Sequence, residues 1–284
     1  MATLDVPNRY LAVAPIIITS PTPRCGTTLV QRLVSSSENA FVYGEEVGNQ
    51  IKTLTAWFVG QLQFIERMGG VLDADFNSAL AGNLDAWRPG LTPPAAIMTK
   101  VWVETFYQMP FLLSSHAGSI GRPLWGFKHP SYDRDTIKAM LSFMPQARVI
   151  YVFRNLFDVL SSAKARKFVN TRNQTIKFCA QWAKNMNEAA ELAQDERILF
   201  VKYEDLIQRR ADYVRLLEMF TKAENIKVDT FDTKLNTYKG DKAKGHSPVQ
   251  YIDPAKLTKT DRATVLDEAG PVLTHLYGDL ATAA

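Results

Sequence analysis

Residues 16–34 constrain the fold of this chain more than any other stretch, because an apolar run, a tight loop and a helix follow one another there. Ile16–Ile18 form a β-branched run typical of a buried parallel strand. After the loop, apolar residues recur with helical spacing at Leu29, Val30, Leu33 and Val34. A strand that enters a helix through a tight loop presents free backbone N–H groups and the positive end of a helix dipole to an anion. The stretch therefore predicts an oxyanion-binding loop.

The side chains of this loop suit phosphate or sulfate oxygens. Gly26 lets the backbone approach a ligand closely, and Arg24 adds a planar fork of donors. Thr27 and Thr28 add hydroxyl donors. The ordinary nucleoside-triphosphate loop requires G-x-x-x-x-G-K-[ST], and its first glycine and its lysine are both missing here. A purely structural strand–turn–helix corner stays open as an alternative at this point.

Composition narrows the class of protein. The 284 residues are 46% hydrophobic, which suits a globular core, and no apolar run approaches the roughly 18 residues of a membrane span. A net charge of +4 suits small polyanionic ligands without requiring nucleic acid. Two cysteines make no disulfide framework, and residues 1–15 contain no clear signal peptide. We therefore expect a cytoplasmic protein with neither a membrane nor a nucleic-acid partner.

Further chemistry-bearing residues follow other short strand candidates. Lys128 ends the apolar segment 124–128, which points it toward the crevice where α/β folds bind ligands. Arg154 follows the strongest strand candidate, Arg148–Phe153, and opens a second strand–arginine–helix unit that predicts a second anion site. Two anion sites on neighbouring strand ends suggest a ligand with two separated phosphates.

Two other strand candidates end in residues of interest. Glu45 and Glu46 follow the candidate Phe41–Tyr43; they suit a cleft, or they are simply acids favoured at a helix N-terminus. Tyr203 follows the candidate Ile198–Val201, where a strand-end side chain meets a ligand. The alternation of strands and helices predicts one α/β domain over residues 1–284, with a central parallel sheet covered on both faces.

The remaining segments are mostly helical. Residues 50–120 are helical and rich in aromatic residues, which either shape an acceptor pocket or, more commonly, form plain core. Residues 174–195 form an amphipathic helix, with Cys179 and Trp182 as core residues. A final helix covers about 261–280.

A glycine-punctuated basic segment precedes this final helix. Residues 238–254 are predicted to form a mobile loop, which is either a lid over an anionic ligand or a solvated surface loop.

Several of these pieces resemble motifs of the sulfotransferase superfamily that uses 3′-phosphoadenosine 5′-phosphosulfate (PAPS). P-R-C-G-T-T-L resembles its 5′-phosphosulfate loop, and Arg154 with Ser162 resembles the pair that holds the 3′-phosphate. G-E-E, F-K-H-P, Y-E-D-L and H-S-P-V-Q resemble further segments in the same order over residues 16–254, most closely those of the tyrosylprotein sulfotransferase branch and its bacterial relatives.

The resemblance implies roles for individual residues. It assigns donor binding to Pro23, Arg24, Cys25, Gly26, Thr27, Thr28, Arg154, Ser162, Arg166 and Tyr203. It assigns catalysis to Glu45 as general base, to Lys128 on the leaving group and to Ser247. No metal is implied, and the four histidines show no ligand spacing.

The sequence departs from the pattern at Cys25, which replaces a serine. A thiol at a helix N-terminus beside Arg24 is expected either to have a lowered pKa and redox sensitivity or to be inert. Asp253 stands where the family pattern has a lysine after the late serine segment.

Two other function classes stay open from the sequence. A metal-dependent nucleotide or small-molecule kinase also uses a strand–loop–helix phosphate site, and an inactive module would bind the bisphosphate nucleotide without transfer. The acceptor hydroxyl is open between a peptide tyrosine, a sugar and a small natural product. Oligomeric state is equally open, with a homodimer as one possibility.

Overall fold

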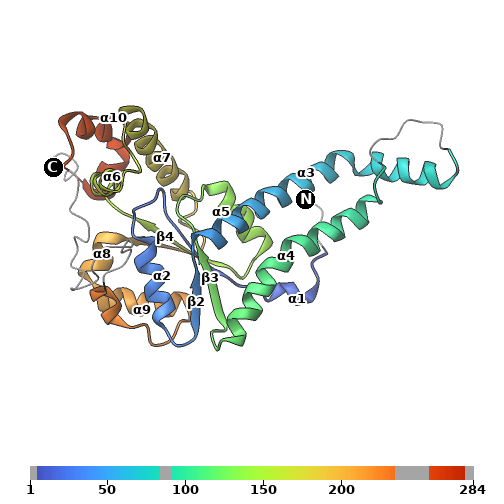
Figure 1. Cartoon of the computed structure of the whole chain (residues 1–284), viewed down its shortest axis with the longest axis horizontal. Coiled ribbons are helices and arrows are strands. Elements are labelled where there is room, and N and C mark those ends of the chain that lie inside the picture. The colour runs from blue at the N-terminus through green and yellow to red at the C-terminus, as the bar shows by residue number, and fades with distance from the viewer. Residues whose placement is uncertain (1–4, 84–90, 234–255, 279–284) are drawn as a thin grey trace.

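The computed structural model describes residues 5–83, 91–233 and 256–278 of the chain. Within these residues, five parallel strands form one sheet with the order β2-β3-β1-β4-β5 (Figure 1). The strands are β1 (Ile16–Thr19), β2 (Ala40–Tyr43), β3 (Leu124–Lys128), β4 (Arg148–Phe153) and β5 (Ile198–Lys202). The predicted α/β fold with a central parallel sheet is confirmed, and every predicted strand is present.

Helices cover both faces of this sheet (Figure 1). One face is covered by α2 (Thr27–Ser36), α8 (Tyr203–Gln208), α9 (Arg210–Thr221) and the 3₁₀ helix η1 (Val228–Asp232). The other is covered by α5 (Arg134–Phe143), α6 (Leu156–Ala165), α7 (Arg172–Ala190) and α10 (Lys259–Tyr277). Strands buried in this way on both sides are continuously apolar, which explains the run at residues 16–18.

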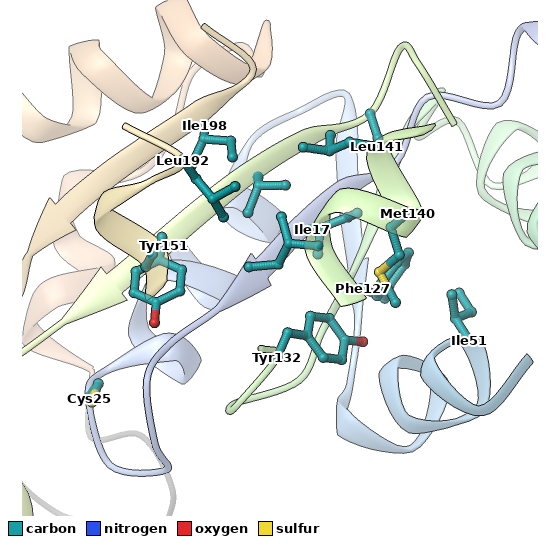
Figure 2. Packing of buried hydrophobic residues seen from close by; sticks show 14 of the residues in the cluster. Ile17, Cys25, Ile51, Phe127, Tyr132, Met140, Leu141, Tyr151, Leu192 and Ile198 are labelled. Carbon is teal, nitrogen blue, oxygen red and sulfur yellow. The ribbon is translucent and has the colours of Figure 1, made fainter. Parts of the chain in front are cut away.

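Alternate residues of each strand enter two separate cores. Ile16 and Ile18 pack with α2 and α9, whereas Ile17 points to the opposite face. Figure 2 shows Ile17 among the side chains of that second core, which also include Tyr151 and Tyr132. The period of two along a strand produces this division.

The aromatic segment forms a helical hairpin. Helix α3 (Glu45–Leu80) and helix α4 (Ala95–Ser119) lie side by side and extend well beyond the sheet (Figure 1). At 36 residues, α3 is about 54 Å long, so only its first turns lie at the sheet. The ring centroids of Phe58 and Phe106 are 4.7 Å apart, and both side chains are fully buried. For these rings, the interpretation as plain core is confirmed.

Some helix boundaries differ from the sequence-based expectation for local reasons. Helix α7 begins at Arg172 because Thr171 and Gln174 form a capping box. It ends at Ala190, before the expected residue 195. Helix α5 was not predicted; the side chain of Asp133 caps it by accepting a hydrogen bond from the backbone N–H of Thr136 at 2.8 Å. Helix α1 (Asn8–Leu11) and η1 were not predicted either.

The predicted mobile loop at 238–254 lies outside the described residues. Among the helices that the structure does describe, none combines the length and the apolar character needed to cross a bilayer.

Candidate functional site

The carboxyl ends of the strands bring the predicted site residues to one edge of the sheet. The oxyanion loop follows β1, Lys128 ends β3, Arg154 follows β4 and Tyr203 follows β5. Strand β1 lies between β3 and β4. After the first loop, the chain therefore adds β2 and β3 on one side of β1 and then β4 and β5 on the other side. Open α/β sheets bind ligands at such a switch point, outside the carboxyl ends of the strands.

The backbone of the first loop adopts conformations that few residues accept. Gly26 has φ +102°, and Arg24 has φ +80°, which is strained for a residue with a side chain. A Cβ on Gly26 would lie 2.3 Å from Cδ2 of Tyr203, so only glycine fits against this ring. Gly26 is also the N-cap of α2, whose first N–H groups have no partner within the helix. The loop therefore has the backbone of an anion cradle.

The structure favours one of the two interpretations of Cys25. Its side chain is fully buried, and its sulfur lies 3.8 Å from the hydroxyl of Thr22. Burial raises the pKa of the Cys25 thiol to about 11, opposite to the lowered value that its place at a helix N-terminus suggested. The inert alternative is therefore the one that the structure supports.

Arg24 and Arg154 make side-chain contacts near the ends of β4 and β5. Arg24 Nε donates a hydrogen bond to Ser162 Oγ at 3.1 Å, which joins the first loop to α6. The guanidinium of Arg154 stacks 4.6 Å from the ring centroid of Tyr203. Arg166 caps the C-terminal end of α6, where its backbone N–H donates to the Ser162 carbonyl at 3.3 Å. The structure thus pairs Arg154 with Tyr203 and Arg24 with Ser162, and it places Arg166 at the end of the helix that carries Ser162.

Arg154 has donor capacity left over in this arrangement. Its Nη2 donates to Asp158 Oδ2 at 3.3 Å. Its Nε is buried and has no hydrogen-bond partner among the described residues. A buried donor without a partner costs free energy, so this atom is an observation in favour of an anionic ligand at the site.

Lys128 and Glu45 form a partly buried ion pair at this edge. Lys128 Nζ lies 2.5 Å from Glu45 Oε1 and donates to Thr28 Oγ1 at 3.0 Å. The Lys128 side chain is 5% exposed, whereas that of Glu45 is 58% exposed. Burial lowers the pKa of the Lys128 ammonium, while the hydrogen bond and charge of Glu45 oppose that shift. One amine therefore connects the first loop to a solvent-accessible carboxylate.

Gly48 sets the distance between α3 and β3 and was not identified from the sequence. A Cβ on Gly48 would lie 2.5 Å from the carbonyl oxygen of Lys128, so α3 packs directly on the strand backbone. The Tyr132 hydroxyl donates to the Gly48 carbonyl at 2.6 Å and fixes the same turn. A glycine one helical turn after Glu45 is the signal that marks this close approach.

The adjacent acids behave differently. Glu45 begins α3, as the helix-terminus interpretation expects, and its side chain also contacts Lys128. Glu46 instead accepts a hydrogen bond from Gln50 on the exposed side of the helix. Ser247, the remaining predicted catalytic residue, lies outside the described residues. In the described ranges, no group of three or more His, Cys, Asp or Glu residues is arranged to hold a metal ion.

Comparison with known proteins decides the family. The model of the sulfotransferase family matches residues 15–224, which is more than half of the chain and includes every strand described above. The chain belongs to the sulfotransferase family. No curated protein matches it.

Solved sulfotransferase structures share this fold at low sequence identity. The sulfotransferase domain of the olefin synthase from Synechococcus PCC 7002 has a TM-score of 0.52 and 17% identity, covering 89% of this chain and 94% of that domain. A sulfotransferase domain from the curacin biosynthetic pathway has a TM-score of 0.52 and 16% identity, covering 89% of this chain and 96% of that domain. These likenesses support the fold of this sulfotransferase.

Proposed function

We propose that this sulfotransferase moves a sulfuryl group from PAPS to an acceptor hydroxyl. The observation that carries the proposal is the position of Lys128 Nζ, 3.0 Å from Thr28 Oγ1 and 2.5 Å from Glu45 Oε1. The same amine contacts the loop proposed to hold the 5′-phosphosulfate and the carboxylate proposed to accept the acceptor's proton. Sulfuryl transfer needs a group that neutralises charge beside the 5′-phosphosulfate and a base beside the acceptor hydroxyl.

The described residues suit a donor that carries phosphate at both ends of a nucleoside. Arg24 and the backbone of the first loop are assigned to the 5′-phosphosulfate, together with Pro23, Cys25, Gly26, Thr27 and Thr28. Arg154, Ser162 and Arg166 are assigned to the 3′-phosphate, and Tyr203 to the nucleoside. The buried Nε of Arg154, which has no partner among the described residues, favours an anion there.

The proposed reaction is an in-line displacement at sulfur. The acceptor oxygen forms the new S–O bond, while the S–O bond to the 5′-phosphate breaks. The acceptor's proton goes to Glu45, whose exposed side chain is accessible from solvent. Lys128 neutralises the charge that develops on the leaving phosphate. The products are a sulfate ester and adenosine 3′,5′-bisphosphate.

The acceptor class is an alcohol or phenol: a peptide tyrosine, a sugar or a small natural product. Glu45 is the only described group that we assign to the acceptor, so acceptor choice within this class is left to screening. Whether the enzyme acts as a homodimer and whether it is cytoplasmic stay predictions, as does the role of Ser247.

A transfer assay tests the proposal. The purified protein is incubated with PAPS and a panel of phenolic peptides, sugars and aliphatic alcohols, with a chelator present. We expect adenosine 3′,5′-bisphosphate and a sulfated acceptor in equal amounts. Phosphorylation that requires ATP and magnesium would instead favour the kinase, and binding of bisphosphate without turnover across the panel would favour an inactive module.

A further inference from the structure

Glu204 makes a hydrogen bond that the proposed mechanism does not use. It follows Tyr203 in the first turn of α8, and its Oε1 accepts a hydrogen bond from the backbone N–H of Asn155 at 2.9 Å. Asn155 directly follows Arg154. The bond therefore joins the two segments that carry the stacked pair, Arg154 on Tyr203.

This bond lies just beyond the last paired residues of β4 and β5. The register of β4 and β5 ends with Phe153 paired to Lys202, and Arg154–Asn155 and Tyr203–Glu204 are the residues that follow this last pair. Strand β5 ends at Lys202, where the chain turns into α8. The Glu204 carboxylate supplies an acceptor to the neighbouring segment after the strand ladder has ended.

The second carboxylate oxygen is also engaged. The Tyr277 hydroxyl, near the end of α10, donates to Glu204 Oε2 at 3.3 Å. Lys202 Nζ lies 4.4 Å from the ring centroid of Tyr277. Burial raises the pKa of the Tyr277 phenol, which keeps it protonated as a donor. Glu204 is thus held from two sides.

The negative charge of Glu204 distinguishes a geometric role of this residue from an electrostatic one. A carboxylate next to an anion site repels the anion, so charge alone would make Glu204 unfavourable for donor binding. We infer that Glu204 is a positioning residue that holds Arg154 and Tyr203 in register for a nucleotide bearing a 3′-phosphate. This inference rests on the proposed function, because it concerns the same donor site.

Calorimetric titration with adenosine 3′,5′-bisphosphate and with ADP tests the role of the bond. Glu204→Gln keeps an acceptor oxygen but removes the charge, and Glu204→Ala removes both. We expect Glu204→Ala to weaken bisphosphate binding about ten-fold and ADP binding clearly less, because ADP shares the nucleoside but lacks the 3′-phosphate. Glu204→Gln should stay within about two-fold of wild type. In steady-state assays the alanine variant should raise KM for PAPS and leave kcat nearly unchanged. Asp205→Ala, at the adjacent position, is the control.

A second pair of variants removes the same bond from its other end. Asn155 has φ −52°, which proline accepts at about −65° ± 15°. Asn155→Pro and Asn155→Ala both lose the side chain that caps α6 by accepting from Phe157 N–H, but only the proline variant loses the backbone donor. We expect Asn155→Pro to reproduce the loss of bisphosphate preference and Asn155→Ala to retain it. This pair decides the matter even if Glu204→Ala fails to fold.

The outcomes distinguish the positioning role of Glu204 from the proposed function on which it rests. A wild-type protein that does not prefer the bisphosphate over ADP would overturn the proposed function itself. A wild-type preference that survives in both Glu204→Ala and Asn155→Pro would overturn the positioning role alone. Tighter bisphosphate binding by both Glu204→Ala and Glu204→Gln would show that charge, and not position, is what Glu204 contributes.

Discussion

Lys128 is the last residue of β3 and Glu45 follows β2, yet their side chains meet with 2.5 Å between Nζ and Oε1. Gly48 makes this possible, because α3 packs directly on the Lys128 backbone. The contact also keeps a largely buried ammonium beside a carboxylate that solvent can reach. The proposed base and the proposed leaving-group residue are therefore one coupled unit.

Removal of the Lys128 ammonium should affect turnover far more than donor binding. In Lys128→Met the leaving phosphate loses its neutralising charge, so we expect kcat to fall about 10²- to 10³-fold. Affinity for adenosine 3′,5′-bisphosphate should stay within about three-fold, because the arginines remain. Lys138→Met, at an exposed surface lysine, is the control in the same transfer assay. Near-normal turnover by Lys128→Met would show that the leaving-group role is wrong.

Replacement of Glu45 should remove the proposed general base without changing the shape of the site. We expect Glu45→Gln to lower kcat about 10²- to 10⁴-fold, measured with saturating PAPS and the best acceptor. Glu46→Gln is a matched control, since Glu46 is adjacent and accepts a hydrogen bond from Gln50 on the exposed face of the helix. Equal activity of the two variants would mean that Glu45 is not the base.

Gly48 offers a test of the packing that brings Glu45 to Lys128. A Cβ there would lie 2.5 Å from a backbone oxygen that cannot rotate away, so Gly48→Ala should push α3 outward. We expect a loss of about 1–3 kcal/mol in the free energy of unfolding and a lower kcat. Gly70→Ala on the same helix meets no atom within 4 Å and should be neutral or stabilise the protein by up to about 1 kcal/mol. Denaturant unfolding and activity of both variants check this; equal behaviour would contradict it.

The thiols should be unreactive in the folded protein. Burial raises the pKa of Cys25 to about 11 and that of Cys179 to about 12, so at pH 8 neither is a thiolate. We expect a chromogenic disulfide reagent to titrate no thiol in the native protein at pH 8 and two after unfolding, since the chain has two cysteines. Rapid reaction of Cys25 in the native protein, lost in Cys25→Ser, would restore the redox-sensitive interpretation.

Much of the site could be predicted because its residues lie in short segments that directly follow predicted strands. The turn at 23–28 and the residues after Phe153 and Lys202 each follow an apolar strand, so sequence order alone places them at the carboxyl edge of a parallel sheet. The long-range packing could not be predicted in the same way. Gly48 has meaning only once α3 lies on β3, and Glu204 only once β4 and β5 are in register.

Local chemistry left two interpretations open at one position. A cysteine at a helix N-terminus beside an arginine usually gains acidity, but the Cys25 side chain turns into the core, where desolvation dominates its pKa. The direction of a side chain in a tight loop depends on the backbone angles of that loop. Arg24 and Gly26 both have positive φ values, and the sequence does not predict a positive φ at an arginine.

The central claim is that the two phosphate sites bind one PAPS-type nucleotide. The most direct test is calorimetric titration of the wild type and of Arg154→Ala with adenosine 3′,5′-bisphosphate and with ADP, without metal, and with Arg215→Ala as an exposed-arginine control. The account predicts clear preference of the wild type and the control for the bisphosphate, and loss of that preference in Arg154→Ala. Equal or tighter binding of ADP by the wild type would contradict it.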